Sequence, residues 1–281
     1  MSMRIAFQGE SGAYSEAAAL EHFGLDAETL PCESFDLVFQ AVGAGDCAVG
    51  LIPIENSLAG SIHRNYDLLL RNDLWVIGEH YLPIHHCLIT IPGVQRDEIK
   101  KVISHPQALA QCDSYLQSWK GIQIEPVYDT AGSVKMVQAL GNRSVAAIAS
   151  RRASELYGMA ILEENIEDDE SNITRFLVIS RTPVDPGSDA KTSIVFSLDN
   201  QPGSLFKALS VFALRNIDLS KIESRPLAGK PWEYFFYIDL TGSTEQVPVQ
   251  RALNHLAEYA PMLRVLGSYP RSRWSGYNQG H

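Results

Sequence analysis

The sequence has few cysteines, no long apolar run and no excess of positive charge. Its 281 residues include four cysteines, 23 lysine or arginine residues and 33 aspartate or glutamate residues, which gives a formal net charge of -10. Because no Lys/Arg cluster supplies the basic face that phosphate binding requires, nucleic acid is not expected as a partner. The apolar stretches 145–149 and 235–238 fall far short of the roughly 20 residues that cross a bilayer, so no membrane association is expected.

Patterns typical of metal or cofactor sites are also missing. The cysteines are Cys32, Cys47, Cys87 and Cys112. They form no C-x-x-C pair and no spacing with histidine that suits a tetrahedral metal site, so reduced core thiols are the better interpretation. The run His85-His86-Cys87 is interpreted as strand packing for the same reason. Neither G-x-G-x-x-G nor G-x-x-x-x-G-K-[ST] is present, so we expect no metal and no cofactor.

The N-terminal residues MSMRIAFQGESG lead directly into a strand-like segment, without an apolar h-region or a small-residue cleavage site. A cytoplasmic location is therefore predicted. The acidic balance gives an anionic ligand no long-range attraction to the protein. Any anion site must then be local, built from helix N-termini and a few well-placed cations.

The first part of the chain repeats one pattern: a short apolar run, a polar turn and a segment with helical periodicity. The apolar runs are 4–8, 48–54, 101–104, 127–129 and 145–149. Repeated units of this kind predict parallel-type sheets covered by helices, with ligands in a crevice beyond the carboxyl ends of the strands. The turns that follow these runs therefore belong to one candidate site.

A change of pattern occurs in the last third of the chain. The acidic run between Leu162 and Asn172 is predicted to be a solvated connection, and 182–189, with two prolines and a glycine, is the clearest linker. Strands are then predicted over 192–198, 219–225, 234–240 and 263–269, with helices over 203–214 and 244–258. The order βαββαβ is typical of a ferredoxin-like sheet.

Three segments of the first part together resemble the signature segments of the prephenate dehydratase family. They are Ile54-Glu55-Asn56-Ser57, Ser104-His105-Pro106-Gln107 followed by Gln111, and Thr174-Arg175-Phe176. The segments 5–9 and 12–15 extend the likeness over most of residues 4–180. Each segment alone is weakly specific, but their order and spacing also agree with the family.

The resemblance implies a two-lobed, periplasmic-binding-protein-like α/β catalytic region over residues 1–182. Lobe 1 is expected from about 1–80 plus 173–182, and lobe 2 from about 81–172. Residues 190–270 are similar to an ACT regulatory domain of the ferredoxin-like type, through 201–205 and 221–226. Ser204 in the first of these motifs, and Phe206 directly after it, stand where the family usually has alanine and valine.

The resemblance also implies a reaction and its regulation. The family converts prephenate to phenylpyruvate in L-phenylalanine biosynthesis, with loss of carbon dioxide and water. The enzyme must assist the leaving hydroxyl, orient the substrate and desolvate the departing carboxylate. Phenylalanine is expected to bind between paired ACT domains as a feedback inhibitor, which implies a homodimer or a homotetramer.

By the same resemblance, the candidate catalytic residues are Thr174, Asn56, Ser104, Gln111 and Glu55. Thr174 is assigned a positioning and relay role at the leaving hydroxyl, because a neutral hydroxyl is a poor proton donor by itself. Asn56, Ser104 and Gln111 are neutral groups that suit substrate orientation. Glu55 is either a buried acid behind the relay or a first-turn helix residue that interacts with the helix dipole.

The candidate substrate-binding residues are Ser11, Arg175 and Phe176. Side chains alternate along a strand, so if Thr174 faces the cleft, Phe176 does too and Arg175 points away. Phe176 would then form an apolar wall that favours decarboxylation, although core packing explains an aromatic residue there equally well. The candidate effector-binding residues are Gly203, Ser204, Leu205, Glu223, Ser224 and Arg225.

Two alternative functions stay open. An arogenate dehydratase acts on a substrate with an amine in place of the side-chain keto group, and the motifs separate the two activities poorly. A two-lobed regulatory protein that binds a small carboxylate would need the same fold but no chemistry. Because no chorismate mutase segment precedes Arg4, the enzyme is expected to be monofunctional.

Overall fold

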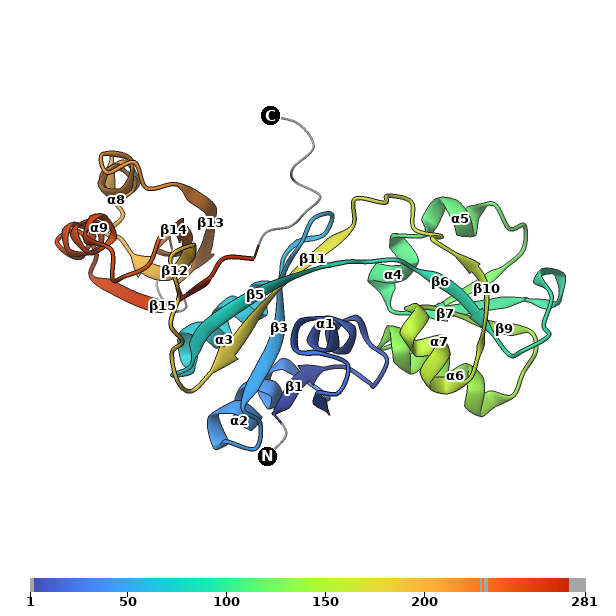
Figure 1. Cartoon of the computed structure of the whole chain (residues 1–281). Coiled ribbons are helices and arrows are strands. Elements are labelled where there is room, and N and C mark those ends of the chain that lie inside the picture. The colour runs from blue at the N-terminus through green and yellow to red at the C-terminus, as the bar shows by residue number, and fades with distance from the viewer. Residues whose placement is uncertain (1–2, 228, 230–231, 273–281) are drawn as a thin grey trace.

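The computed structural model describes residues 3–227, 229 and 232–272. Figure 1 shows three bodies in a row, with the N-terminal lobe in the middle, the second lobe on one side and the C-terminal domain on the other. Among the described residues, no helix is long and apolar enough to cross a membrane. The predicted fold class, a two-lobed α/β region followed by a βαββαβ domain, is confirmed.

The first lobe contains a mixed sheet with the strand order β2-β1-β3-β11-β5, and β4 pairs with β3. Its strands are β1 (Arg4–Gln8), β2 (Glu28–Cys32), β3 (Val49–Asn56), β4 (Gly60–Ser61), β5 (Trp75–Pro83) and β11 (Ile173–Ser180), and its helices are α1 (Tyr14–Phe23), α2 (Phe35–Ala44) and α3 (His63–Arg71). β1 runs parallel to β2 and β3, whereas β11 runs antiparallel to β3 and β5. A strand from the far end of this region therefore completes the first sheet.

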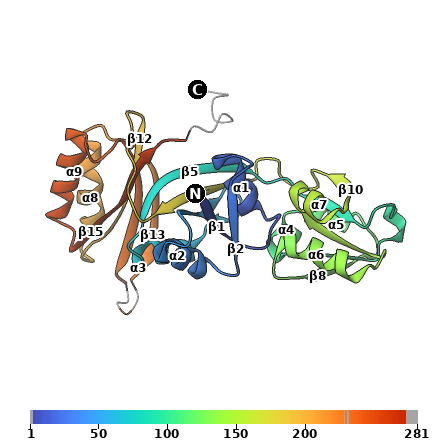
Figure 2. The same ribbon diagram turned by 60° about the horizontal axis from the view of Figure 1, so that its bottom comes forward.

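The second lobe contains a five-stranded sheet with the order β10-β6-β9-β7-β8. Its elements are β6 (Cys87–Thr90), η1 (Arg96–Glu98), β7 (Lys101–Ser104), α4 (Pro106–Ala110), α5 (Asp113–Gln117), β8 (Gln123–Pro126), α6 (Thr130–Leu140), β9 (Val145–Ala149), α7 (Arg151–Tyr157) and β10 (Ala160–Glu164). β7 is parallel to β8 and β9, so the turns after these strands meet at one edge of the sheet. That edge faces the first lobe (Figure 2).

Two segments connect the lobes: 84–86, between β5 and β6, and 165–172, between β10 and β11. They hydrogen-bond to each other, because the backbone N–H of Ile84 donates to Asn172 at 2.8 Å and that of Ile166 donates to His86 at 3.1 Å. The acidic run predicted to be solvated thus includes one of the connecting segments. Glu167 in this run is buried.

The C-terminal domain has the predicted order β12 (Ala190–Ser197), α8 (Ser204–Ala213), β13 (Leu219–Pro226), β14 (Tyr234–Thr241), α9 (Val247–Ala257) and β15 (Met262–Pro270). The strands form an antiparallel sheet with the order β13-β14-β12-β15. Figure 2 shows α8 and α9 on the outer face of this sheet and the first lobe on its inner face. Both faces carry buried apolar residues: Ile194 and Phe196 pack under the helices, while Val195 and Tyr269 pack with Val76 of the first lobe.

Candidate active site

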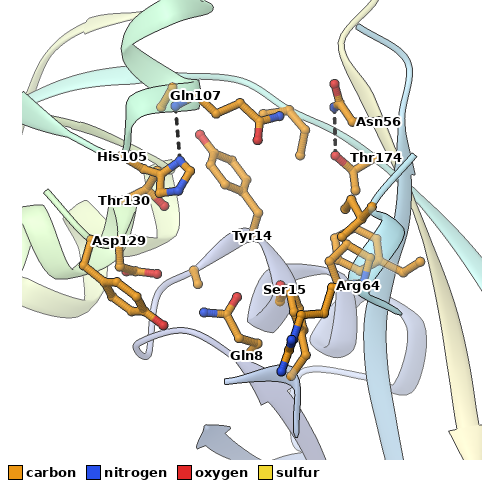
Figure 3. Close-up of a pocket in the computed structure, with 18 of the residues that line it drawn as sticks. Gln8, Tyr14, Ser15, Asn56, Arg64, His105, Gln107, Asp129, Thr130 and Thr174 are labelled. Atoms are coloured by element: carbon orange, nitrogen blue, oxygen red, sulfur yellow. Dashed lines mark hydrogen bonds between the residues drawn. The ribbon is translucent and has the colours of Figure 1, made fainter. Parts of the chain in front are cut away.

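A cavity of about 500 Å³ lies between the two lobes of the α/β region (Figure 3), within the size range of small-molecule sites. From the first lobe it is lined by Gln8, Tyr14, Asn56, Arg64, Thr174 and Phe176, and from the second by His105, Gln107, Gln111, Asp129 and Thr130, among others. The second-lobe residues come from the turns after β7 and β8 and from α4 and the start of α6. These are the turns that the βα pattern predicts to gather at one site.

Asn56 and Thr174 lie opposite each other on paired strands β3 and β11 and both are buried. The Asn56 Nδ2 donates to Thr174 Oγ1 at 3.0 Å and to Asn172 Oδ1 at 2.7 Å. The Asn56 Oδ1 accepts from the backbone N–H groups of Leu58 and Ala59, so the amide is held at both ends. Thr174 Oγ1 therefore accepts a hydrogen bond from Asn56, and among the described residues no acceptor receives a hydrogen bond from the Thr174 hydroxyl. That proton remains available for a ligand in the cavity.

Phe176 follows Thr174 on the same face of β11 and lines the cavity. Its ring also packs in the core with Ile5, Leu51 and Val178. With Ile84, it gives this wall of the cavity an apolar surface. The two interpretations of Phe176, a cleft wall and a core residue, thus describe two sides of one ring.

Few charged groups line the cavity, and they are of both signs. Arg64 pairs with Asp36 at 2.5 Å, and this hydrogen bond lowers the pKa of Asp36. Burial raises the pKa of Asp129, whose Oδ1 caps α6 by accepting from the backbone N–H of Gly132 at 2.6 Å. Burial also lowers the pKa of His86 and His105, which favours their neutral forms at pH 7. Neutral hydrogen-bonding groups therefore dominate the cavity.

Ser104 and Ser11, both predicted site residues, do not line this cavity. Ser104 is fully buried and its hydroxyl donates to the carbonyl of Ile148 at 2.6 Å, which ties β7 to β9. Ser11 lies in the turn after β1, where its carbonyl accepts from the Tyr157 hydroxyl at 3.0 Å. The structure gives both residues contacts that support the walls of the cleft.

Arg175 and Glu55, also predicted site residues, point away from the cavity. Glu55 lies 2.9 Å from Lys221 of the C-terminal domain. Arg175 is buried between the domains, 2.8 Å from Glu79 and 2.5 Å from Asp239. Since each neighbours a cavity residue on its strand, the alternation of side chains turns it to the opposite face. The assignment of Arg175 to substrate binding, and that of Glu55 to a relay behind Thr174, are corrected accordingly.

The predicted effector residues lie in two places. Glu223 and Arg225 face the first lobe, where Glu223 accepts from the Ser61 hydroxyl and Arg225 lies 3.1 Å from Asp67. Ser224 lies on the other face of β13 and is exposed. Gly203, with φ of 84°, caps α8, which begins with Ser204 and Leu205.

Several residues that sequence reasoning did not select as site residues also border the cavity, and Tyr14 and His86 are two of them. Tyr14 points into it from the start of α1, and His86 lies in the connection between β5 and β6. The His86 Nε2 lies 2.9 Å from the Oε1 of Gln111. The signal for Tyr14 was its place in the segment 12–15 that extends the family resemblance. The signal for His86 was the adjacent pair of histidines, which was interpreted as strand packing.

The fold and the cleft define a two-lobed α/β enzyme with a C-terminal ferredoxin-like regulatory domain. Comparison with known proteins gives the family: a model described as prephenate dehydratase matches residues 5–184, and one described as ACT domain matches residues 192–258. The chain belongs to the prephenate dehydratase family, whose members are lyases. The resemblance deduced from the three signature segments is confirmed.

Relatives and solved structures refine this assignment. The chain is 51% identical to arogenate dehydratase/prephenate dehydratase 1, chloroplastic, of Arabidopsis thaliana, over 95% of this chain and 72% of that protein. A structure of prephenate dehydratase in complex with L-Phe from Arthrobacter aurescens has a TM-score of 0.88 and 32% identity, and covers 96% of this chain and 90% of that one. A structure described as GqqA, a novel type of quorum quenching acylase, has the same TM-score and 36% identity, and covers 96% and 98%.

Proposed function

We propose that this protein is a dehydratase that converts prephenate to phenylpyruvate in the cleft between its lobes. Residues 1–182 would carry the reaction and residues 190–270 its regulation. The observation that carries the proposal is the Asn56–Thr174 pair, because Asn56 occupies the acceptor side of the Thr174 hydroxyl and leaves its proton directed to a ligand. A leaving hydroxyl on a bound substrate requires a donor of this kind.

In the reaction, the bond between the ring and its carboxylate breaks and its electron pair enters the ring, while the bond to the ring hydroxyl breaks. The products are carbon dioxide, phenylpyruvate and, after protonation of the hydroxide, water. Thr174 hydrogen-bonds the departing oxygen, and the proton comes ultimately from solvent because a threonine hydroxyl is a weak acid. Among the described lining residues, no acidic side chain hydrogen-bonds to Thr174 and could supply this proton through it.

The apolar wall formed by Phe176 and Ile84 supports the loss of the carboxylate. A carboxylate in contact with such a wall loses hydration, and its charge disappears as carbon dioxide forms. The neutral donors of the opposite lobe, such as Thr130 and the amide of Gln107, then orient the remaining carboxylate of the side chain.

Arogenate is a second candidate substrate, and Asp129 favours it. In both substrates the ring hydroxyl is para to the carbon that bears the side chain. With the hydroxyl at Thr174, the side chain therefore points to the wall that contains Asp129 (Figure 3). A carboxylate there would attract the ammonium group of arogenate and repel the keto acid. The names of several relatives, 46–51% identical, also include arogenate dehydratase.

The test is to measure phenylpyruvate formation from prephenate and phenylalanine formation from arogenate, for the wild type and for Asp129→Asn. The carboxamide keeps the helix cap but removes the charge. If Asp129 recognises the ammonium, the ratio of kcat/KM for arogenate over prephenate falls about tenfold, corresponding to one charge-assisted contact. Wild-type protein that is folded but turns over neither substrate would refute the dehydratase proposal itself.

We also propose that phenylalanine inhibits the enzyme by binding between paired C-terminal domains of a homodimer or homotetramer. Phe206 and Ile222, on α8 and β13, are 76% and 48% exposed, which leaves an apolar surface at the edge of this domain. The structure of the relative from Arthrobacter aurescens is described as a complex with L-Phe. Phenylalanine titration of the activity, with light scattering to give the oligomeric state, tests both parts.

A further inference from the structure

His86 lies in the shorter of the two segments that connect the lobes. Its ring contacts one side chain from each lobe. The ring Nδ1 lies 2.7 Å from the Tyr14 hydroxyl oxygen, on α1 of the first lobe. The Nε2 lies 2.9 Å from the Oε1 of Gln111, at the C-terminal end of α4 in the second lobe. The residue is 1% exposed and borders the cavity. One imidazole thus joins two side chains that line opposite walls of the cleft.

Among the residues that the structure describes, one carboxylate acts on the charge of His86. The Glu167 carboxylate accepts from the backbone N–H of His86 at 2.8 Å and lies 2.7 Å from the Nδ1 of His85. The other titratable groups around the pair formed by His86 and Tyr14 are the phenol and two thiols. Burial raises the pKa of Tyr14, Cys87 and Cys112, so all three are protonated at neutral pH.

The hydrogen bonds around the ring fix where its proton lies. The Tyr14 hydroxyl donates to the carbonyl oxygen of His85 at 2.7 Å, and its single proton is used there. The His86 Nδ1 must then donate to the Tyr14 oxygen. Burial lowers the pKa of His86 despite the hydrogen bond to Gln111 and the charge of Glu167, so the ring is neutral and its Nε2 accepts. A neutral ring in this tautomer accepts from the N–H end of the Gln111 amide. The amide must then be turned end for end from the arrangement in the structure, where its Oε1 lies 2.9 Å from Nε2.

Protonation of the ring favours the opposite orientation of the amide, the one in the structure, with Oε1 facing Nε2. An imidazolium donates from both nitrogens, so its Nε2 requires the oxygen of the Gln111 amide instead. The amide would rotate by about 180° and present its N–H groups, in place of its oxygen, to the cavity. The charge of His86 therefore decides which end of Gln111 a substrate meets.

We propose that His86 is a positioning residue for the dehydratase reaction: it joins Tyr14 to Gln111 across the connection between the lobes and fixes the orientation of the Gln111 amide in the cleft. The inference rests on the proposed function. It assigns no bond-making step to His86, whose effect on the rate passes through Gln111.

Substitutions that keep one contact at a time test this inference. In His86→Asn the amide lies near the position of Nδ1 and retains the contact with Tyr14, whereas in His86→Gln the longer side chain reaches the Gln111 side. We expect His86→Asn to lower kcat about tenfold, the effect of one lost orienting hydrogen bond, with KM within about twofold. His86→Gln should recover most of the rate. His80→Asn is the matched control, because burial also lowers the pKa of His80 but this partly buried residue lies outside the cavity.

Two further measurements separate positioning from a purely structural role. In a Gln111→Ala background, His86→Asn should cause no additional loss of kcat. The kcat of the wild type should also fall in acid. Because burial lowers the pKa of His86, this acid limb should lie below the ordinary histidine value of about 6.5, and it should be absent from His86→Asn. Multiplicative losses in the double variant, or an unchanged kcat in His86→Asn, would overturn the proposal.

Nuclear magnetic resonance keeps the test independent of turnover. The ¹⁵N shifts of the imidazole, assigned by the signal lost in His86→Asn, should show the neutral Nδ1–H tautomer. A neutral Nε2–H tautomer would overturn the proposal even in an active enzyme. If neither prephenate nor arogenate is converted, the proposed function fails, and the tautomer still decides whether His86 holds Tyr14 and Gln111 as inferred.

Discussion

The two faces of the strand pair β3 and β11 differ sharply in chemistry. On one face Asn56 and Thr174 line the cleft with neutral hydrogen-bonding groups. On the other face, one residue away on each strand, Glu55 and Arg175 form ion pairs with the C-terminal domain. Neutral groups can bind and release a substrate at little electrostatic cost, whereas buried charges require permanent partners.

This difference shows how one strand pair serves two purposes. Arg175 contacts Glu79 and Asp239 in the buried interface, and Lys191 lies 2.7 Å from the same Glu79. A displacement of the C-terminal domain would therefore act on the residue next to Thr174. The comparison predicts that changes on the cleft face affect turnover, while changes on the interface face affect stability and regulation.

The largest expected effect is on stability, from Arg175→Met. The substitution leaves Asp239 buried without its cation, and breaking a buried pair in this way costs about 3–5 kcal/mol. Urea denaturation should show a correspondingly lower unfolding free energy or an early loss of contact between the domains. A midpoint equal to that of the wild type would mean that the interface does not depend on this ion cluster.

The second largest expected effect is a loss of turnover in the variant Thr174→Ala. Loss of a donor aimed at a leaving oxygen lowers kcat by about 10²–10³. The circular dichroism spectrum and the urea midpoint should change little, because the methyl group of Ala fits the same position. Thr174→Ser keeps the hydroxyl and serves as the matched control. Equal activities of the alanine and serine variants would remove Thr174 from the mechanism.

The interface face should also respond to acid. Burial by itself would raise the pKa of Asp239, but the charge of Arg175 and a hydrogen bond from Ser193 outweigh it and hold this pKa below the ordinary value. The resulting stability is complete above the unfolded-state pKa, near 3.8, and is lost as the pH falls through the folded-state pKa. Acid titration of unfolding should show this loss in the wild type and a smaller one in Ser193→Ala.

The smallest expected effect is at the rim of the interface, where Arg225 pairs with Asp67. Both side chains are partly exposed, so Arg225→Met should change the unfolding free energy by only about 0.2–1 kcal/mol. Added salt should reduce the difference further. A loss comparable to that of Arg175→Met would show that the contrast between the buried centre and the rim is incorrect. The phenylalanine titration of the same variant tests whether the pair transmits inhibition.

By itself, the sequence determined the local features of this protein. Apolar periodicity and the linker 182–189 predicted the βα units and the βαββαβ order, and the alternation rule placed Thr174 and Phe176 on one face and Arg175 on the other. Periodicity of this kind is a property of neighbouring residues, so it can be seen before folding. The motif match could not separate residues that line the cleft from residues behind it, such as Ser104, whose hydroxyl bonds to the carbonyl of Ile148.

Only the tertiary structure decided the long-range partners. The pairing of Asn56 with Thr174 joins residues that are 118 positions apart, and the ring of His86 joins two helices from different lobes. Likewise, Arg175 meets Asp239 only because the C-terminal domain docks on the first lobe. Hydrogen-bond and ion-pair partners depend on how whole elements pack. A local sequence pattern identifies candidate side chains. Only packing decides whether each of them contacts a ligand, the other lobe or the C-terminal domain.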